Sequence, residues 1–305
     1  MHERTKRDNQ YVFTGFYERL TQIDVKHTHA SLNAQSFRFD ALQTNEDGER
    51  MQDSDDDLAN SNFIQLLKQE KFNNRTPEYT KVFRDLETLS FSFPLLILNK
   101  TKVIAKLLGY IKNDALKVVH TGVIDLIIAL IKDMRHDIYE EFLQQILPSV
   151  IQVLDASNLK MMDKIFQLLS FSFKYLAKPI KSDIENVYDV YFELIKHRNR
   201  FVRKFTCQSI SYIIRKLTID ENLIKMLLKP LIDGGASEDS RSQDDEIHGM
   251  CDLFFEVLSG QTDDLHSKAS TFLQFLLSSP DVLNLKACGK IIRYLYLKMI
   301  NTINT

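Results

Sequence analysis

The sequence predicts an all-α fold, an α-solenoid built from stacked helix pairs. The 305-residue chain contains nine glycines, six prolines and no tryptophan, a composition that favours helices with short connections over a β-sandwich. From Asn62 onward, apolar residues recur at positions i, i+3, i+4 and i+7 over long stretches, as they do on the buried face of a helix. Three similar segments begin at Leu116, Leu159 and Val202, so they follow one another at intervals of 43 residues.

Three regions follow one another along the chain. Residues 1–30 contain one short amphipathic helix, expected within YVFTGFYERLTQIDV (Tyr11–Val25). Residues 31–61 are expected to form a disordered acidic linker, because residues 40–60 contain eight acids and only one arginine. Residues 62–305 then form the helical repeats, interrupted by a polar, acidic insert at residues 233–246.

Polar breaks divide residues 62–305 into individual helices. Short breaks are expected near Asn73–Pro77, Asn113–Asp114, His136–Asp137, Asp155–Asn158, Pro179–Lys181, His197–Asn199 and Ile219–Asp220, and a longer one at Ser278–Leu283. The later helices are expected at Glu221–Ile232 and Ile247–Leu258, from Leu265 onward, and at Lys286–Ile300. The pattern leaves open how the repeats are phased after residue 220.

Each repeated segment follows a turn, and a second helix is expected between successive segments. Each segment opens with an apolar residue followed by Lys or Arg and continues as a helix of four to five turns. Two helices in about 40–47 residues are typical of HEAT and armadillo repeats. The last helix is apolar on more than one face, which predicts either that the solenoid continues beyond residue 305 or that its end docks on a partner.

No constellation of residues predicts catalysis or a bound cofactor. The nucleotide-binding, metalloprotease and hydrolase motifs are absent, and His27 and His29 are poorly spaced as metal ligands. The three cysteines, Cys207, Cys251 and Cys288, are far apart and predict buried free thiols. The longest apolar run is too short to span a bilayer. We therefore expect no enzymatic activity, metal, small-molecule substrate or membrane.

Two serines lie in acidic surroundings that an acidophilic kinase prefers. These are Ser54, before three aspartates, and Ser242, followed by Gln and two aspartates. The same acidic composition is explained by a solvated linker, which is the first interpretation. Phosphorylation of the two serines is the alternative.

The stretch HRNRFVRKFTCQSISYIIRKL (His197–Leu217) is locally basic although the net charge of the chain is −2. The repeat pattern places Val202, Phe205, Ile210, Ile213 and Ile214 on its inward face, and Arg203 at a position that braces the neighbouring repeat. Cations gather at the turn and outer surface, so the candidate RNA- or partner-binding residues are Lys196, Arg198, Arg200, Arg203 and Lys204. The alternative is that they are the solvated back of a structural helix.

Five segments in order resemble the amino-terminal region of one family. They are YVFTGFYERLTQIDV, IDLIIALIKDMRHDIYEEF, LLSFSFKYLAKPI, LIKHRNRFVRKFTCQSISYIIRKL and the pair DLFFEVLSG…LHSKASTFLQFLL. The family is that of U3 small nucleolar RNA-associated protein 20, the HEAT-repeat scaffold of the small-subunit processome also named "down-regulated in metastasis". The acidic linker departs from the family, and nothing is carried over to it.

The resemblance implies a non-catalytic scaffold of the nucleus and nucleolus. Its partners would be other processome proteins, pre-ribosomal RNA and the U3 small nucleolar RNA particle, in processing that leads to 18S ribosomal RNA. The alternative is a HEAT-repeat adaptor for nuclear transport or trafficking, which would bind protein cargo and not RNA.

Overall fold

The computed structural model describes most of residues 61–258 and a short N-terminal segment. The described residues are 12–23, 61–73, 76–218, 220–233, 240–258, 274, 289–293 and 296–297. The acidic linker up to residue 60, His27, His29, Ser54 and Cys288 lie outside these residues, and so does the helix expected from Leu265 except for residue 274. The helix expected at Lys286–Ile300 is described only in part. Within the described residues every regular element is a helix, which confirms the all-α fold.

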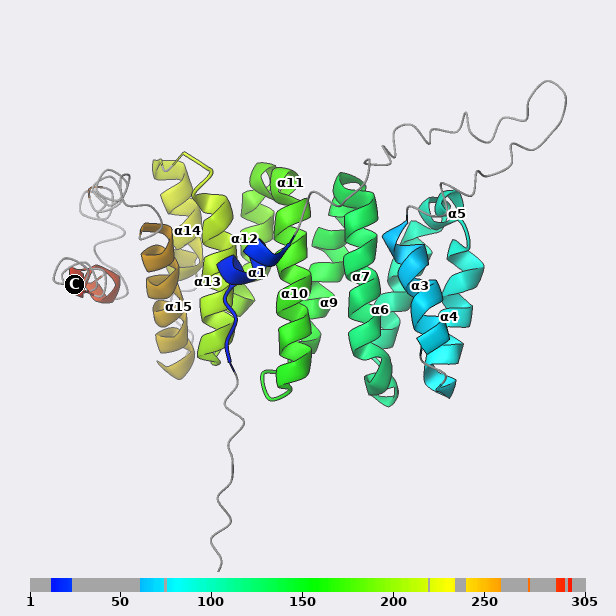
Figure 1. The fold of residues 1–305 in the computed structure, drawn as a ribbon. Coiled ribbons are helices and arrows are strands. Elements are labelled where there is room, and N and C mark those ends of the chain that lie inside the picture. Colours follow the sequence, from blue (N-terminus) through cyan, green and yellow to red (C-terminus); the bar gives the residue numbers. More distant parts are fainter. Residues whose placement is uncertain are drawn as a thin grey trace, which may run out of the picture.

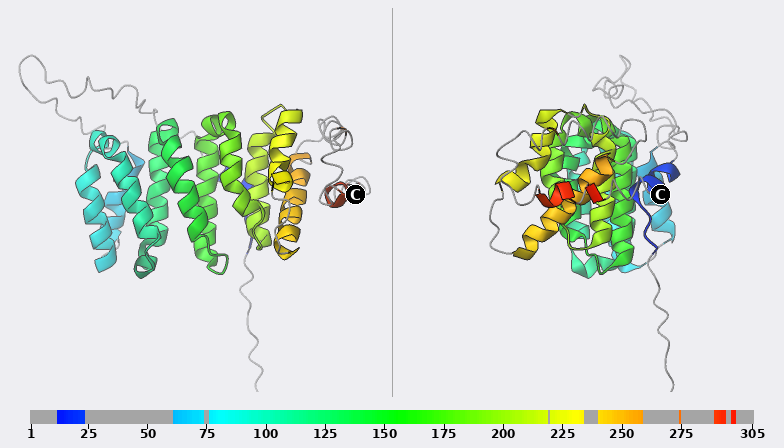
Figure 2. Two further views of the ribbon diagram at one scale, coloured as in Figure 1. Left: turned by 180° about the vertical axis from the view of Figure 1, so that it is seen from behind. Right: turned by 90° about the vertical axis from the view of Figure 1, so that its left-hand side faces the viewer.

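The helices stack side by side in two layers (Figures 1 and 2). One layer contains α3 (Asn62–Asn73), α7 (His120–Met134), α10 (Leu159–Tyr175), α13 (Arg200–Ile214) and α15 (Ser240–Leu258). The helices behind it are α4 (Pro77–Ser90), α6 (Lys100–Ile111), α9 (Leu147–Val153), α12 (Ile184–Ile195) and α14 (Glu221–Asp233). Successive helices of the first layer contact one another, and α4, α6 and α12 contact helices of that layer, so the molecule is a HEAT-like solenoid.

Short elements connect these helices. They are α5 (Phe93–Leu98), the 3₁₀ turns η3 (Asp114–Val119) and η4 (Arg135–Ile138), α8 (Tyr139–Glu141), the π turn η5 (Phe142–Ile146) and α11 (Ala177–Ser182). The helix α1 (Phe16–Gln22) belongs to neither layer and lies across α10 and α13 (Figure 1).

The three repeated segments become the equivalent helices α7, α10 and α13, which follow one another in one layer. Asn158 and Asn199 cap α10 and α13, because their side-chain oxygens accept hydrogen bonds from the first free backbone N–H groups of each helix. The first segment differs, since its opening residues form η3 and α7 begins only at His120.

Three boundaries differ from those expected from the sequence. The break expected at Pro179–Lys181 falls inside α11, where Pro179 is the third residue and its missing N–H has no intrahelical partner to lose. The chain also bends at Phe91 and Ser92, a break that the apolar run concealed. The helix expected from Ile247 begins at Ser240, so the last residues of the predicted insert 233–246 are helical.

A continuous apolar core runs between the layers. The predicted inward residues of α13 are all fully buried: Val202, Phe205, Ile210, Ile213 and Ile214. The helices α12 and α15 approach unusually closely at Gly249, where an added Cβ atom would lie 2.1 Å from the carbonyl oxygen of Ile195. Among the described helices, none is both long and apolar enough to cross a bilayer.

Candidate functional site

The predicted basic site lies at the turn between α12 and α13. The side-chain oxygen of Asn199 accepts hydrogen bonds from the backbone N–H groups of Phe201 (2.8 Å) and Val202 (3.4 Å). The backbone N–H of Asn199 donates in turn to Nδ1 of His197 at 3.0 Å. These local bonds fix the turn, so the cations before and after it occupy defined positions.

Arg203 holds this turn together. Its Nη1 donates hydrogen bonds to the carbonyl oxygens of His197 and Arg198, both at 2.9 Å. Its Nε lies 3.7 Å from a carboxylate oxygen of Asp252 on α15, and only 15% of its side chain is exposed. Arg203 thus occupies the bracing position that the repeat pattern indicates. Its Nη1 is engaged by two carbonyl oxygens of the turn, and its buried Nε lies at ion-pair distance from Asp252 without a hydrogen bond among the described residues. We exclude it from the surface that we propose for a partner.

Acids on α15 face two further members of the predicted set. Lys196 pairs with Glu193 at 2.8 Å and lies 4.0 Å from Glu246. Arg198 lies 3.9 Å from Asp245, although 81% of its side chain remains exposed. The sequence pattern did not identify Asp245 and Glu246 as partners of this turn, because both were assigned to the insert 233–246. The acidic run SQDDE is visible in the sequence and could have indicated a partner for the basic turn. The sequence does not show that this run lies opposite the turn, because the phase of the repeats after residue 220 was left open.

Arg200 and Lys204 are the members of the set that remain exposed without a carboxylate within ion-pair distance among the described residues. Arg200 lies over the ring of Phe201, 4.9 Å from its centroid. Lys204 lies 5.4 Å from the ring centroid of Phe13, which comes from the N-terminal segment. A cation over an aromatic face retains its charge and can still contact an anion. The five predicted residues are therefore neighbours with different roles.

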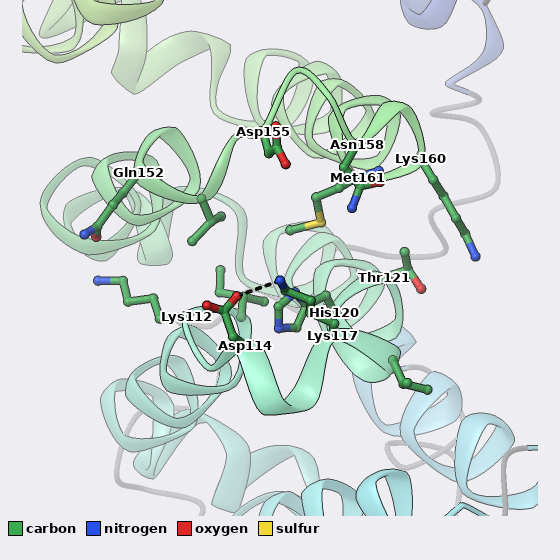
Figure 3. A pocket seen from close by; sticks show the side chains of 13 residues that line it. Lys112, Asp114, Lys117, His120, Thr121, Gln152, Asp155, Asn158, Lys160 and Met161 are labelled. Atoms are coloured by element: carbon green, nitrogen blue, oxygen red, sulfur yellow. Dashed lines mark hydrogen bonds and ion pairs between the residues drawn. The ribbon is translucent and has the colours of Figure 1, made fainter.

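The second candidate site is a hollow of about 630 Å³ between the η3 turn and the turn that precedes α10 (Figure 3). Lys112, Lys117 and Lys160 line it together with two acids. Lys117 pairs with Asp114 at 3.2 Å, and Asp155 accepts hydrogen bonds from Ser157. No motif in the sequence predicted this hollow. Its mixed charges favour no single class of ligand.

The described cysteines are unsuited to nucleophilic chemistry. Cys207 and Cys251 are free and buried, which confirms the sequence prediction for these two cysteines. Burial raises the pKa of the Cys207 thiol well above its ordinary value, and that of Cys251 to about 12. The neighbouring Arg203 does not reverse this effect. No group of three or more potential metal ligands occurs in the part of the chain that the structure describes.

Comparison with known proteins points to helical repeats and to one group of relatives. A family model described as the serine/threonine-protein kinase mTOR domain, which is of the HEAT type, matches residues 68–171, from α3 into α10. Two curated yeast proteins with the same name are also similar to the chain. Both are named U3 small nucleolar RNA-associated protein 20.

The two similarities are distant and cover a small part of each relative. The Saccharomyces cerevisiae protein is 21% identical over 169 residues, which are 54% of this chain and 7% of that protein. The Schizosaccharomyces pombe protein is 22% identical over 226 residues, which are 73% of this chain and 8% of that protein. The matches agree with the resemblance found in the five sequence segments.

Proposed function

We propose that the chain is a non-catalytic scaffold in ribosome biogenesis, a component of the small-subunit processome that supports processing of pre-ribosomal RNA to 18S RNA. The observation that carries this proposal is the similarity to two proteins named U3 small nucleolar RNA-associated protein 20. The helical-repeat stack supports it, because such a fold offers an extended surface to large assemblies. The corresponding location is the nucleolus, and the partners are processome proteins, pre-ribosomal RNA and the U3 particle.

The contact surface that we assign to this function comprises Arg198, Arg200 and Lys204, named here the outer cations. Their side chains are exposed and lie within seven residues on one turn and the start of one helix. Arg203 and Lys196 position the turn and pair with acids, so they contribute indirectly. Lysine and arginine side chains that meet phosphates release bound counterions, which makes RNA affinity dependent on salt.

Charge reversal of Arg200 and Lys204 tests the surface. We expect Arg200→Glu combined with Lys204→Glu to weaken binding to purified U3 small nucleolar RNA in a salt titration. Loss of two phosphate contacts would reduce the slope of log K against log salt by about 1.4–1.8. The fold should survive, because both side chains are exposed.

The matched control is Lys102→Glu combined with Lys106→Glu. These two lysines are exposed, have the same i, i+4 spacing and lie on α6 near the other end of the stack. The control changes the charge equally and should leave the salt slope unchanged. Equal slopes for wild type and the Arg200/Lys204 variant would contradict the contact surface.

Purification from nuclear extract tests the scaffold role separately. We expect the wild-type chain to recover U3 RNA and precursors of 18S RNA. Recovery of pore or coat proteins without these RNAs would contradict the scaffold proposal and support a transport adaptor.

A further inference from the structure

The N-terminal residues 12–23, named here the strap, lie in a groove formed by helices far along the chain. The helix α1 crosses α10 and α13 and contacts both (Figure 1). Phe16 is fully buried in this groove. Its ring lies 5.5–6.1 Å from those of Phe173, Phe205 and Tyr212. The strap thus inserts an aromatic anchor into a site that the solenoid itself lines with aromatic side chains.

A second aromatic contact lies beside the outer cations. Phe13 stacks on Phe201 with ring centroids 5.2 Å apart, and its edge meets Phe166 at 6.3 Å. Phe166 in turn stacks on Phe205 at 4.1 Å. The strap therefore covers an aromatic row that runs from the start of α13 into the core.

Polar contacts fix the direction of the strap. The backbone N–H of Phe16 donates to Oε1 of Gln208 at 2.9 Å. The Tyr17 hydroxyl lies 3.0 Å from Oγ of Ser211 and accepts a hydrogen bond from Arg215 at 2.6 Å.

An ion pair from the middle of α1 completes this pattern. Arg19 pairs with Asp163 on α10, and only 10% of the Arg19 side chain is exposed. Aromatic anchors combined with a directed ion pair are typical of a helix bound in a groove.

The strap does not have the properties of an integral repeat. The helix α1 contains seven residues, too few to be stable alone, so its helical form depends on the groove. Most of its side chains remain at least partly exposed; among the strap residues only Phe16 and Ile23 are buried. Residues 24–61 separate it from the first helix of the solenoid, and its polar contacts with α10 and with the α13 region are made 144 to 198 residues further along the chain.

We propose that the groove between α10 and α13 is a peptide-binding site, and that the strap is its displaceable occupant in cis. The partner that fits is a short amphipathic helix with aromatic side chains at the positions of Phe13, Phe16 and Tyr17, followed by an arginine at the position of Arg19. Displacement of the strap uncovers Phe201 beside Arg200 and Lys204. This proposal does not rest on the function proposed above.

The test uses the full chain with its strap anchors removed, Phe13→Ala and Phe16→Ala. A fluorescent peptide of residues 11–25 serves as the probe. We expect this variant to bind the peptide at least about tenfold more tightly than the wild-type chain, in which the tethered strap competes at high effective concentration. Failure of a helical, folded variant to bind the peptide would overturn the proposal, and so would equal binding by the wild-type chain.

A charge swap distinguishes docking in the groove from general attraction between aromatic groups. Adding Asp163→Arg to the anchor-free chain should abolish binding of the natural peptide and permit binding of a peptide with Arg19→Glu. Asp163 suits this test because 46% of its side chain is exposed. A specific groove would be contradicted if the natural peptide and the Arg19→Glu peptide bound equally well to the anchor-free chain with and without Asp163→Arg.

Hydrogen exchange of the wild-type chain provides the test that needs no variant. We expect the amide of Phe16 to exchange faster than buried amides in the middle of α10 and α13, because a displaceable strap opens without unfolding the stack. Equal rates would mean that the strap leaves only on global unfolding, which would overturn the proposal.

Discussion

Gly249 shows how one atom sets the distance between two helices. A side chain at this position would place its Cβ 2.1 Å from the backbone carbonyl oxygen of Ile195, and a backbone atom cannot move aside as a flexible side chain can. The glycine therefore permits α15 to pack against α12, and through this contact it positions the acids that face the basic turn.

We expect Gly249→Ala to destabilise the protein by about 1–3 kcal/mol, the usual cost of overpacking. Urea unfolding monitored by circular dichroism measures the change. Gly109→Ala is the control, because Gly109 lies in α6 with nothing within 4 Å of an added Cβ. In that open helical position alanine should be neutral or stabilise by up to about 1 kcal/mol. Equal effects of the two substitutions would contradict the close approach.

His197 makes the basic turn sensitive to acid. Burial, and then the positive charge of Arg203, lower the pKa of His197 below its ordinary value of 6.5. The neutral ring accepts the hydrogen bond from the N–H of Asn199, and protonation at Nδ1 removes that acceptor. The stability due to His197 is therefore present above pH 6.5 and is lost as the pH falls through the lower pKa of the folded state.

Comparison of the wild-type chain with His197→Asn isolates this effect. Asparagine retains a side-chain acceptor near the turn but does not titrate in this range. We expect the wild type to lose more stability than the variant between pH 7.5 and pH 5, as measured by urea midpoints. Parallel losses would show that other groups account for the acid sensitivity.

At the scale of the elements, one carboxylate of α7 caps the start of α3. Asp133 accepts hydrogen bonds from the backbone N–H groups of Asn62 (3.0 Å) and Phe63 (2.9 Å) and from the hydroxyl of Ser61 (2.9 Å). Free N–H groups at a helix start carry a partial positive charge, so a carboxylate there is stabilising. The first two helices of this layer are thus joined by polar contacts as well as by apolar packing.

We expect Asp133→Ala to cost about 1–3 kcal/mol, because it leaves these donors without their acceptor. Faster hydrogen exchange in the first turn of α3 should accompany the loss. Asp114→Ala is the control. Asp114 is exposed, and its one ion pair among the described residues is with the exposed Lys117, a contact of little energetic value. An unchanged first turn in the Asp133 variant would contradict the capping role.

At the scale of the whole molecule, local sequence signals predicted the stack but not the contacts between distant segments. Asn158 and Asn199 marked helix starts, and apolar spacing identified the buried face of α13. These features depend on neighbouring residues, so they can be read from a single sequence.

The candidate site was predictable in place but only partly in the roles of its members. The repeat pattern identified Arg203 as the bracing residue, but it did not distinguish Arg198, which lies 3.9 Å from a carboxylate of α15, from the exposed Arg200. That difference depends on Asp245, 47 residues away from Arg198, and thus on the phase of the later repeats. The docking of Phe16 beside Gln208 depends on an even longer separation, which no periodicity encodes.

The strap is translated well before the helices on which it docks, so it cannot dock until translation has reached those helices. Phe16 is synthesised near the beginning, but Gln208, its hydrogen-bond partner, follows 192 residues later. At about 5–20 residues per second, the nascent segment waits roughly 10–40 s before its groove exists. During that interval its aromatic side chains are available to chaperones or to any other emerging chain. The segment can dock in the groove only after α13 has been translated.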